Sequence, residues 1–165
     1  MMAACTAASS GHSVTVLEHS EKTLLKLGIT GKGRCNITNN TDTDGLMKNI
    51  ATNSRFLYGA FSRFSSSDTM DFFESIGVPL KTERGNRVFP ASDKSLDVVY
   101  ALRAHAKRLG VKVVKANAER INTSEGVVVS VTANGKNYSC DSVILATGGM
   151  SYPKTGSDGS GYELA

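Results

Sequence analysis

One run of residues, Gly31-Lys32-Gly33-Arg34-Cys35-Asn36-Ile37-Thr38-Asn39, constrains this chain more than any other segment. Two glycines separated by one residue let a backbone approach a ligand closely and adopt conformations that other residues avoid. A guanidinium, a thiol and a carboxamide follow the second glycine at once, and no apolar side chain occurs before Ile37. Packing alone does not account for such a segment, so we interpret it as a ligand-contacting turn.

The first half of the chain predicts helices, one strand and a hairpin. Met1–Ser10 is rich in alanine and predicts a helix that ends at Gly11, and Ser13–Glu18 predicts a short buried strand that closes with an acid. The polar stretch within Gly11–Asn53 that follows this strand predicts a long loop. The remaining expectations are two helices within Ser54–Ile76, the second capped by Ser67 or Asp68 and stopped by Gly77, a hairpin over Pro79–Pro90 and a helix over Ser95–Leu109.

From Val111 onward the pattern changes to β-structure. Four short strand candidates follow one another, and Asn134-Gly135 between the last two is a strong signal for a two-residue hairpin. Their ranges are Val111–Ala116, Ala118–Thr123, Val127–Ala133 and Lys136–Cys140, and a buried apolar run over Ser142–Ala146 comes next. These patterns predict an α/β fold, an open Rossmann-like sheet with a small antiparallel β-meander, as one partial domain over residues 1–165.

Composition argues against several classes of protein. The formal net charge is +4, but Lys and Arg are scattered among acids, which argues against nucleic-acid binding. No apolar run reaches the roughly 18 residues that a membrane span needs, and Met1–Ser10 lacks the features of a signal peptide. Cys5, Cys35 and Cys140 share no C-x-x-C spacing, so neither a disulfide framework nor a metal site is expected. We therefore predict a cytoplasmic protein without a nucleic-acid or membrane partner.

Glu18 and Thr147-Gly148-Gly149 each follow an apolar strand candidate, at the sheet edge where open α/β folds bind ligands. In dinucleotide-binding folds an acid at the end of the second strand accepts hydrogen bonds from ribose hydroxyls; a solvated acid at a strand end is the alternative. The fingerprint G-x-G-x-x-G that should precede this strand is absent, so we expect a truncated piece without the turn that normally holds the pyrophosphate. The spacing within Gly28–Gly33 argues against a P-loop.

Several residues have both a binding and a structural interpretation. Arg34 could pair with a phosphate or a flavin carbonyl, or be a surface arginine. Cys35 has no Cys or His near it in the sequence, so a small buried neighbour of the ligand fits it better than a redox thiol. Asn36 could bind a heterocycle or shape the turn. Thr147-Gly148-Gly149 could pass close to a cofactor or form a tight turn, and Gly156–Gly161 could be a ligand loop or a frayed end.

Together these features resemble one family. The residues that carry the resemblance are Glu18, Lys26-Leu27, Gly31-Lys32-Gly33-Arg34-Cys35-Asn36, Arg87-Val88-Phe89-Pro90 and Ala146-Thr147-Gly148-Gly149-Met150-Ser151-Tyr152-Pro153. Over essentially its whole length the chain is similar to bacterial NAD(P)/FAD-dependent oxidoreductases called aminoacetone oxidase-like flavoproteins or dehydro-bile-acid reductases. It departs from them in the missing glycine turn, in Thr23-Leu24 where members have Leu-Gly, and in the residue order of its tail.

The resemblance implies a two-dinucleotide-binding flavoprotein fold that binds FAD. It implies that Glu18 meets the adenosine ribose, that Ala118 contacts the adenine through its backbone, and that Thr147 and Gly148 pass near the flavin or the pyrophosphate. Lys26 and the glycine-rich turn would line the pyrophosphate and flavin side. The cofactor-binding residues expected in this way are Glu18, Lys26, Gly31, Gly33, Arg34, Cys35, Asn36, Ala118, Thr147 and Gly148.

The function implied is that of an FAD-dependent oxidoreductase that transfers a hydride to or from a small organic substrate, with NAD(P)H as the candidate co-substrate. Members of the family are more than twice as long, so an inserted domain and a C-terminal FAD-binding segment are expected beyond Ala165. The sequence itself names no catalytic acid or base. The alternative is a non-catalytic fragment that binds no cofactor on its own. With either interpretation, the isolated 165 residues are expected to be inactive.

Overall fold

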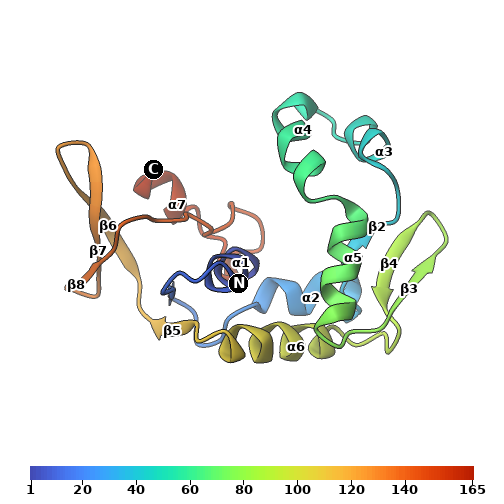
Figure 1. The fold of residues 1–165 in the computed structure, drawn as a ribbon, viewed down its shortest axis with the longest axis horizontal. Coiled ribbons are helices and arrows are strands. Elements are labelled where there is room, and N and C mark those ends of the chain that lie inside the picture. Colours follow the sequence, from blue (N-terminus) through green and yellow to red (C-terminus); the bar gives the residue numbers. More distant parts are fainter. The chain divides into compact units, whose positions relative to one another are not determined.

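The computed structural model describes residues 1–165 and divides them into two compact units. Unit 1 consists of Met1–Lys26 and His105–Ala165, and unit 2 consists of Leu27–Ala104. Helix α6 (Ser95–Arg108) begins in unit 2 and ends in unit 1 (Figure 1). None of the helices combines the length and the apolar character that crossing a membrane requires.

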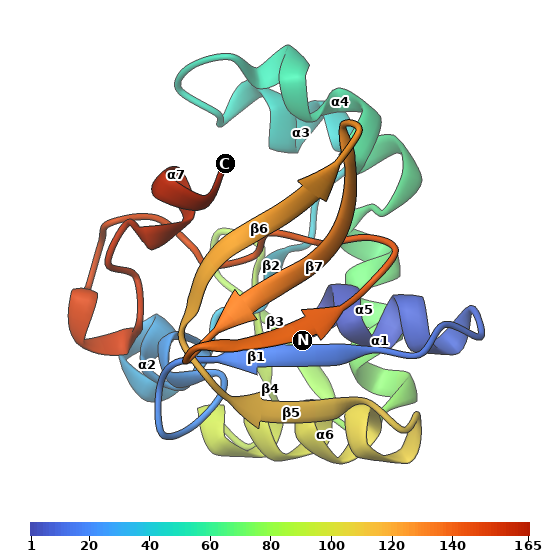
Figure 2. The same ribbon diagram turned by 90° about the vertical axis from the view of Figure 1, so that its left-hand side faces the viewer.

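The parallel sheet of unit 1 contains two strands, β1 (Thr15–Glu18) and β5 (Lys112–Lys115), which lie side by side in Figure 2. Thr15 lies opposite Lys112 and Glu18 lies opposite Lys115. Helix α1 (Met2–Ser9) precedes β1, and the helix ends where predicted because Gly11 adopts a φ of +88°. The strand was also predicted, but its side chains are half-buried or exposed rather than buried.

Three antiparallel strands form the predicted β-meander of unit 1: β6 (Ala118–Ser124), β7 (Val127–Ala133) and β8 (Lys136–Ser139). Asn134 and Gly135 connect β7 to β8 with φ values of +46° and +69°. Positive φ at both central residues is the geometry of the hairpin turn that Asn-Gly favours, so the hairpin prediction is confirmed.

The prediction of a buried strand over Ser142–Ala146 is wrong. The segment lies outside every helix and strand, and Ile144 and Leu145 are 66% and 41% exposed. A strand requires a neighbouring backbone that accepts and donates its hydrogen bonds. In this sheet β1 pairs with β5 alone, and no ladder joins either strand to the apolar run. The chain then continues into a short 3-10 helix, η1 (Pro153–Thr155), and α7 (Ser160–Leu164).

The predicted loop within Gly11–Asn53 is also partly wrong, because it contains two helices and a short strand: α2 (Leu25–Gly33), β2 (Thr38–Asn39) and α3 (Thr43–Lys48). Asp42 caps α3 by accepting a hydrogen bond from the Gly45 amide at 2.8 Å. Helical geometry in α2 breaks at Thr30, which has a ψ of 152°, so the glycine-rich motif still forms a turn.

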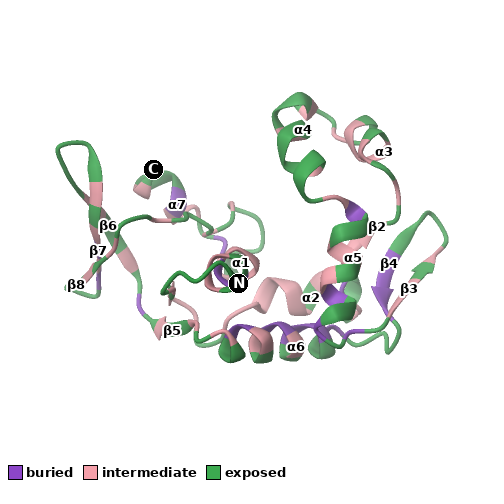
Figure 3. Cartoon of the chain, viewed as in Figure 1, coloured by how far each residue is buried: buried purple, intermediate pink, exposed green.

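Unit 2 is built from α4 (Ser54–Arg63), α5 (Ser66–Ser75) and the hairpin of β3 (Leu80–Glu83) with β4 (Arg87–Pro90). The two helices, the hairpin and helix α6 were all predicted. Strand β4 lies between β2 and β3 and carries buried side chains, whereas α4 is exposed along most of its length (Figure 3). The cap of α5 was placed wrongly: Ser65, not Ser67 or Asp68, is the N-cap, and Asp68 completes its capping box.

Candidate functional site

The glycine-rich turn of unit 2 has a backbone that only glycine suits at one position. Gly31, Lys32 and Cys35 have φ values of +56°, +58° and +63°, in the left-handed region. A Cβ atom on Gly31 would lie 2.9 Å from the backbone nitrogen of Asn36 and 3.0 Å from Cε1 of Phe89. Gly33 also has a positive φ, but a Cβ there would meet nothing within 4 Å. The first glycine is therefore required by close packing and the second by backbone conformation alone.

Arg34 lies at the centre of the contacts that hold this turn. Its Nε donates to Oδ1 of Asp93 at 2.8 Å, and its Nη2 donates to Oε1 of Glu83 and to Oδ1 of Asp93, both at 2.5 Å. The guanidinium carbon also lies 4.1 Å from the centroid of the Phe89 ring, within cation–π range. Arg34 is therefore bound to groups of its own chain and stays partly exposed, so its ligand-binding interpretation and its interpretation as a surface arginine both remain predictions.

A second cation completes this charged cluster. Lys81 Nζ lies 2.6 Å from Oδ2 of Asp93 and 3.4 Å from Oε1 of Glu83. Hydrogen bonds from Lys81 and then Arg34 lower the pKa of Asp93, and the hydrogen bond from Arg34 is the main cause that lowers the pKa of Glu83. Both carboxylates are ionised at neutral pH, so they balance the two cations and are unsuited to general acid or base catalysis.

Cys35 and Asn36 complete the turn. Cys35 is fully buried, and burial raises the pKa of its thiol, with a smaller opposing effect from a hydrogen bond with Thr30. It is therefore a buried small side chain, and a thiol of this kind is a poor nucleophile. When the Asn36 amide is oriented to satisfy its neighbours, its nitrogen donates to the carbonyl oxygens of Thr38 at 3.1 Å and Val88 at 3.2 Å. These bonds support its turn-shaping role.

In unit 1, Glu18 lies at the carboxyl end of β1, as predicted. Its Oε1 accepts a hydrogen bond from the Ser20 amide at 2.8 Å, which orients the half-buried carboxylate. One oxygen of the carboxylate is thus used by the local backbone, and Oε2 is the acceptor that remains for a ligand.

The segment after residue 146 packs against the residues that follow β1. Lys26 Nζ donates to the Ser151 carbonyl oxygen at 2.7 Å, and Nδ1 of His19 lies 3.7 Å from Oδ2 of Asp158. A Cβ on Gly156 would lie 2.8 Å from Nε2 of His19. These contacts place Lys26 beside the segment that follows Gly148. No local sequence pattern indicates the approach of His19 to Asp158, because the two residues are 139 positions apart.

Thr147 and Gly148 line a cavity of about 250 Å³ in unit 1 together with Leu145, Gly161, Tyr162 and Ala165. Gly148 has a φ of +81°, and a Cβ there would lie 3.0 Å from Oγ of Ser157. Ala118, the first residue of β6, pairs with Ala133 and does not line this cavity. Thr147 and Gly148 therefore share one cavity, and Ala118 is not among the residues that line it.

A second cavity, of about 410 Å³ in unit 2, was not predicted. Three carboxamides and two glycines dominate its wall, and its lining residues are Asn39, Thr41, Gly45, Leu46, Asn49, Gly85 and Asn86. Asn39 Nδ2 donates to the Gly85 carbonyl oxygen at 2.8 Å, which ties the strand β2 to the hairpin turn. The polar composition of residues 38–53 is the sequence feature that could have indicated this cavity, but the sequence analysis interprets it only as part of a long loop.

Three curated proteins show what the chain is similar to. It is 34% identical over 92% of its length to a 3-dehydro-bile acid delta(4,6)-reductase of Clostridium scindens. It is 27% identical over 96% of its length to a ribosomal RNA dihydrouridine synthase of Haemophilus influenzae, and 25% identical over 100% of its length to a protein of the same name from Escherichia coli. The chain spans 36% of the length of the first relative and 40% of each of the other two.

The family described as the HI0933-like protein Rossmann domain matches residues 1–165. This match agrees with the parallel pair β1 and β5 and with the acid at the end of β1. The Rossmann-like α/β fold expected from the sequence is thus confirmed. The chain belongs to the HI0933-like Rossmann domain family.

Proposed function

We propose that these 165 residues are the FAD-binding part of a longer oxidoreductase that transfers a hydride to or from a small organic substrate, with NAD(P)H as co-substrate. The observation that carries this proposal is the position of Glu18 at the carboxyl end of the parallel strand β1, in a chain matched over 1–165 by a Rossmann family. Ligands of open α/β sheets bind beyond that end of the strands.

The residues of unit 1 fit a dinucleotide cofactor. Oε2 of Glu18 is a free acceptor for a ribose hydroxyl, and the Lys26 ammonium supplies a positive charge for a pyrophosphate. Gly148 and Thr147 line one cavity, where a ligand would meet the backbone of this segment. Bound FAD would supply the hydride chemistry, and these residues would bind and orient it.

The test uses the full-length protein that contains this chain. We expect it to purify yellow with about one FAD per chain, and Glu18→Ala to weaken FAD binding by at least about tenfold through loss of a charged hydrogen-bond acceptor. Glu21→Ala is the matched control, because Glu21 is exposed and pairs with Lys115. A colourless full-length protein that gains no thermal stability with FAD would overturn the proposal.

Two further measurements separate the finer parts of the proposal. Anaerobic addition of NADH or NADPH should bleach the flavin absorbance if either is the reductant, and no bleaching with both would remove NAD(P)H from the proposal. The 165-residue chain measured alone should bind FAD at least about tenfold more weakly than the full-length protein, because its sequence lacks the G-x-G-x-x-G fingerprint whose turn normally holds the pyrophosphate. Equal affinities would show that this turn is dispensable.

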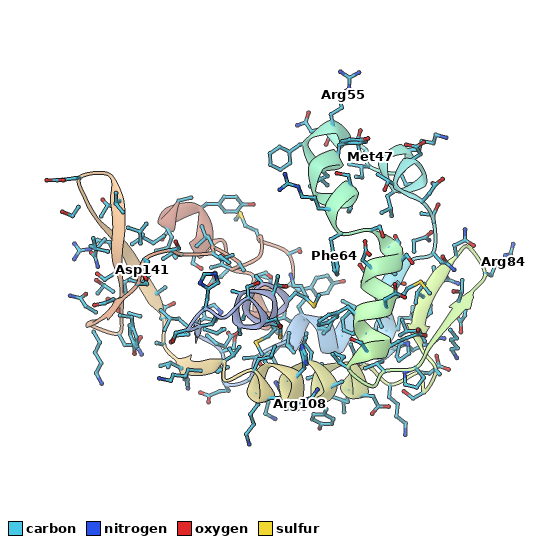
Figure 4. All side chains as sticks on the ribbon, viewed as in Figure 1. Met47, Arg55, Phe64, Arg84, Arg108 and Asp141 are labelled. Carbon is cyan, nitrogen blue, oxygen red and sulfur yellow. The ribbon has the colours of Figure 1, made fainter.

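RNA is the second candidate for the substrate class, because two relatives are named ribosomal RNA dihydrouridine synthases. One observation of this structure favours it. Residues 45–67 contain Lys48, Arg55 and Arg63 and no acid, and Phe56 on α4 is 86% exposed. Arg55 extends away from the end of α4 in Figure 4. Cationic groups beside exposed aromatic rings are typical of surfaces that bind single-stranded nucleic acids.

Fluorescence anisotropy with a labelled single-stranded oligoribonucleotide tests this candidate. If α4 binds RNA, replacing Arg55 and Arg63 by alanine weakens binding and reduces its dependence on salt. Arg84→Ala is the matched control, because Arg84 is an exposed arginine of the same unit at the hairpin tip. Equal binding by wild type, double variant and control would exclude α4 as the RNA-binding surface.

A further inference from the structure

The cavity of about 410 Å³ in unit 2 is formed by residues of that unit alone. Strand β2 with the residues just after it, helix α3 and the turn between β3 and β4 each supply part of its wall. Asn39, Thr41 and Leu46 are half-buried, whereas Asn49 and Asn86 are exposed. The half-buried residues therefore form the inner part of the wall, and the exposed ones surround its opening. The volume is within the range of pockets that bind small molecules.

Two carboxamides of this wall are held in fixed orientations. Asn39 Nδ2 donates to the Gly85 carbonyl oxygen at 2.8 Å. Asn49 Nδ2 donates to the Gly45 carbonyl oxygen, also at 2.8 Å. Because only the nitrogen of a carboxamide can donate, these bonds fix the position of the oxygen in each group. The Oδ1 atoms of Asn39 and Asn49 are therefore acceptors that remain available to a ligand.

Two further polar groups of the wall are not used by the chain. The Thr41 hydroxyl and the Asn86 carboxamide form no hydrogen bond with other residues. Thr41 Oγ1 has room in the wall because residue 45 is glycine, and a Cβ atom at that position would overlap this oxygen. Glycine is unfavourable inside a helix, so the approach of the hydroxyl explains its presence in α3. Both the hydroxyl and the carboxamide can donate and accept.

The residues that line the cavity restrict the charge and the shape of its ligand. None of them is charged, so an anion or a cation would leave water without a compensating partner in the wall. Leu46 supplies the only fully apolar side chain, and the wall contains no aromatic ring against which a flat ligand could stack. The wall therefore suits an uncharged ligand that is rich in groups able to donate and to accept hydrogen bonds.

We propose that this cavity binds the hydroxyl groups of a sugar ring. A hydroxyl can donate to the fixed Oδ1 atoms of Asn39 and Asn49, and it can also accept from the Thr41 hydroxyl. Neighbouring hydroxyls of one ring present several such groups without any charge. A free monosaccharide and the ribose of a nucleoside both offer this chemistry. The inference does not depend on the proposed FAD function, because none of the lining residues is among the expected cofactor-binding residues.

Saturation-transfer NMR on the full-length protein tests the proposal, with D-ribose, methyl β-D-glucopyranoside and uridine as probes. Excess FAD is present throughout, so that a flavin site does not take up the probes. We expect saturation transfer to the sugar protons of at least one probe. Transfer to ribose or to the glucoside identifies a free sugar as the ligand, and transfer to the sugar protons of uridine alone identifies a nucleoside. Transfer to none of the probes, or only to the base protons of uridine, would overturn the proposal.

Two variants place the bound sugar in this cavity, and each removes a polar group without removing a hydrogen bond of the fold. Thr41→Val keeps the shape of the side chain and deletes the hydroxyl. Asn86→Gly deletes the carboxamide at a position whose φ of +57° glycine adopts readily. Each variant should keep the thermal unfolding of the wild type and weaken sugar binding about threefold to tenfold, as for a lost hydrogen bond between uncharged groups.

Asn40→Ala is the matched control, because the side chain of Asn40 donates to Thr82 and does not line the cavity. Its sugar affinity should equal that of the wild type. Weaker binding in either cavity variant together with an unchanged control supports the proposal. Equal affinity of the wild type and both cavity variants, or an equal loss in the control, would overturn it.

Discussion

The two units support their candidate binding segments in different ways. In unit 2 the turn around Gly31 is held by Glu83, Asp93 and the ring of Phe89, and Phe89 itself is buried. In unit 1 the segment that leads into Thr147-Gly148 carries exposed apolar side chains and has no strand partner. The turn around Gly31 is thus held by two carboxylates and an aromatic ring. The Thr147-Gly148 segment instead follows an apolar run whose side chains remain in contact with solvent.

This difference shows what makes a binding turn self-supporting. The hairpin of β3 and β4 forms from residues close together in the sequence, and β4 pairs with β2 just beyond the turn. The turn of unit 2 is therefore supported by a strand pairing within its own unit. In unit 1, β1 pairs only with β5, and the apolar run at Ser142–Ala146 forms no strand beside either of them. Substitutions in matched pairs, one in each unit or at each motif, test the comparison.

The largest expected effect comes from truncating the same residue type in each unit. Leu102 of unit 2 is 2% exposed, so Leu102→Ala should lower the free energy of unfolding by about 2–5 kcal/mol. Leu145→Ala in unit 1 should change it by only about 0.5 kcal/mol, because that side chain is already in contact with water. Urea unfolding of both variants measures the difference. Similar losses at the two positions would show that the Ser142–Ala146 segment is packed as tightly as the core of unit 2.

A second pair of variants separates packing from backbone strain within the turn. Gly31→Ala should destabilise by about 2–3 kcal/mol, since a Cβ would press on the Asn36 nitrogen and the Phe89 ring in addition to the strained φ. Gly33→Ala should cost only about 1 kcal/mol, because φ is positive there but the space is open. Thermal unfolding at equal concentrations gives both values. If Gly33→Ala lowered the stability as much as Gly31→Ala, the close contacts of Gly31 would add nothing to the cost of the strained backbone.

A third pair of variants identifies the residue that caps α5 in unit 2. Ser65 accepts the Asp68 amide and completes a capping box, so Ser65→Ala should destabilise by about 1 kcal/mol. Ser67 is exposed and lies inside the helix, so Ser67→Ala should be nearly neutral or slightly favourable. Circular dichroism during thermal unfolding distinguishes the two. A larger loss for Ser67→Ala would restore the cap that the sequence predicted.

The sequence predicted those elements whose determinants are local. Gly11, Gly77 and Asn134-Gly135 mark helix ends and a hairpin through their own backbone preferences, and the structure has positive φ at all of them. The sequence placed the cap of α5 wrongly because Ser65, Ser66 and Ser67 are chemically alike, and only the register of the helix chooses among them. The Ser142–Ala146 prediction failed because strand formation depends on a partner that the pattern does not reveal.

The candidate site residues also differ in whether local sequence could predict them. Glu18 at a strand end and Gly31 in a turn are positions that residue type and spacing identify. The partners of Arg34 were not predictable, because Asp93 lies 59 positions away and two folded segments must meet before the ion pairs form. Likewise, the amide-lined cavity of unit 2 depends on contact between α3 and the hairpin turn, which no local pattern encodes.

The smallest expected effect is a pH dependence specific to the cluster of unit 2. Asp93 has a lowered pKa in the folded chain, from Lys81 first and Arg34 second, so it contributes stability above its unfolded pKa of about 3.9 and loses that contribution as pH falls through the lower folded value. Asp93→Asn should therefore have a lower Tm than wild type at pH 7, and this deficit should shrink towards zero below about pH 4. High salt should also reduce this deficit in Tm, because the groups are accessible to solvent.

The control is Asp97→Asn, because Asp97 lacks these partners. Its Tm should not converge with that of wild type at low pH, and calorimetry of the three proteins across pH provides the measurement. A deficit for Asp93→Asn that persisted unchanged at pH 3 would mean that the cluster stabilises the turn through packing of neutral groups rather than through charge.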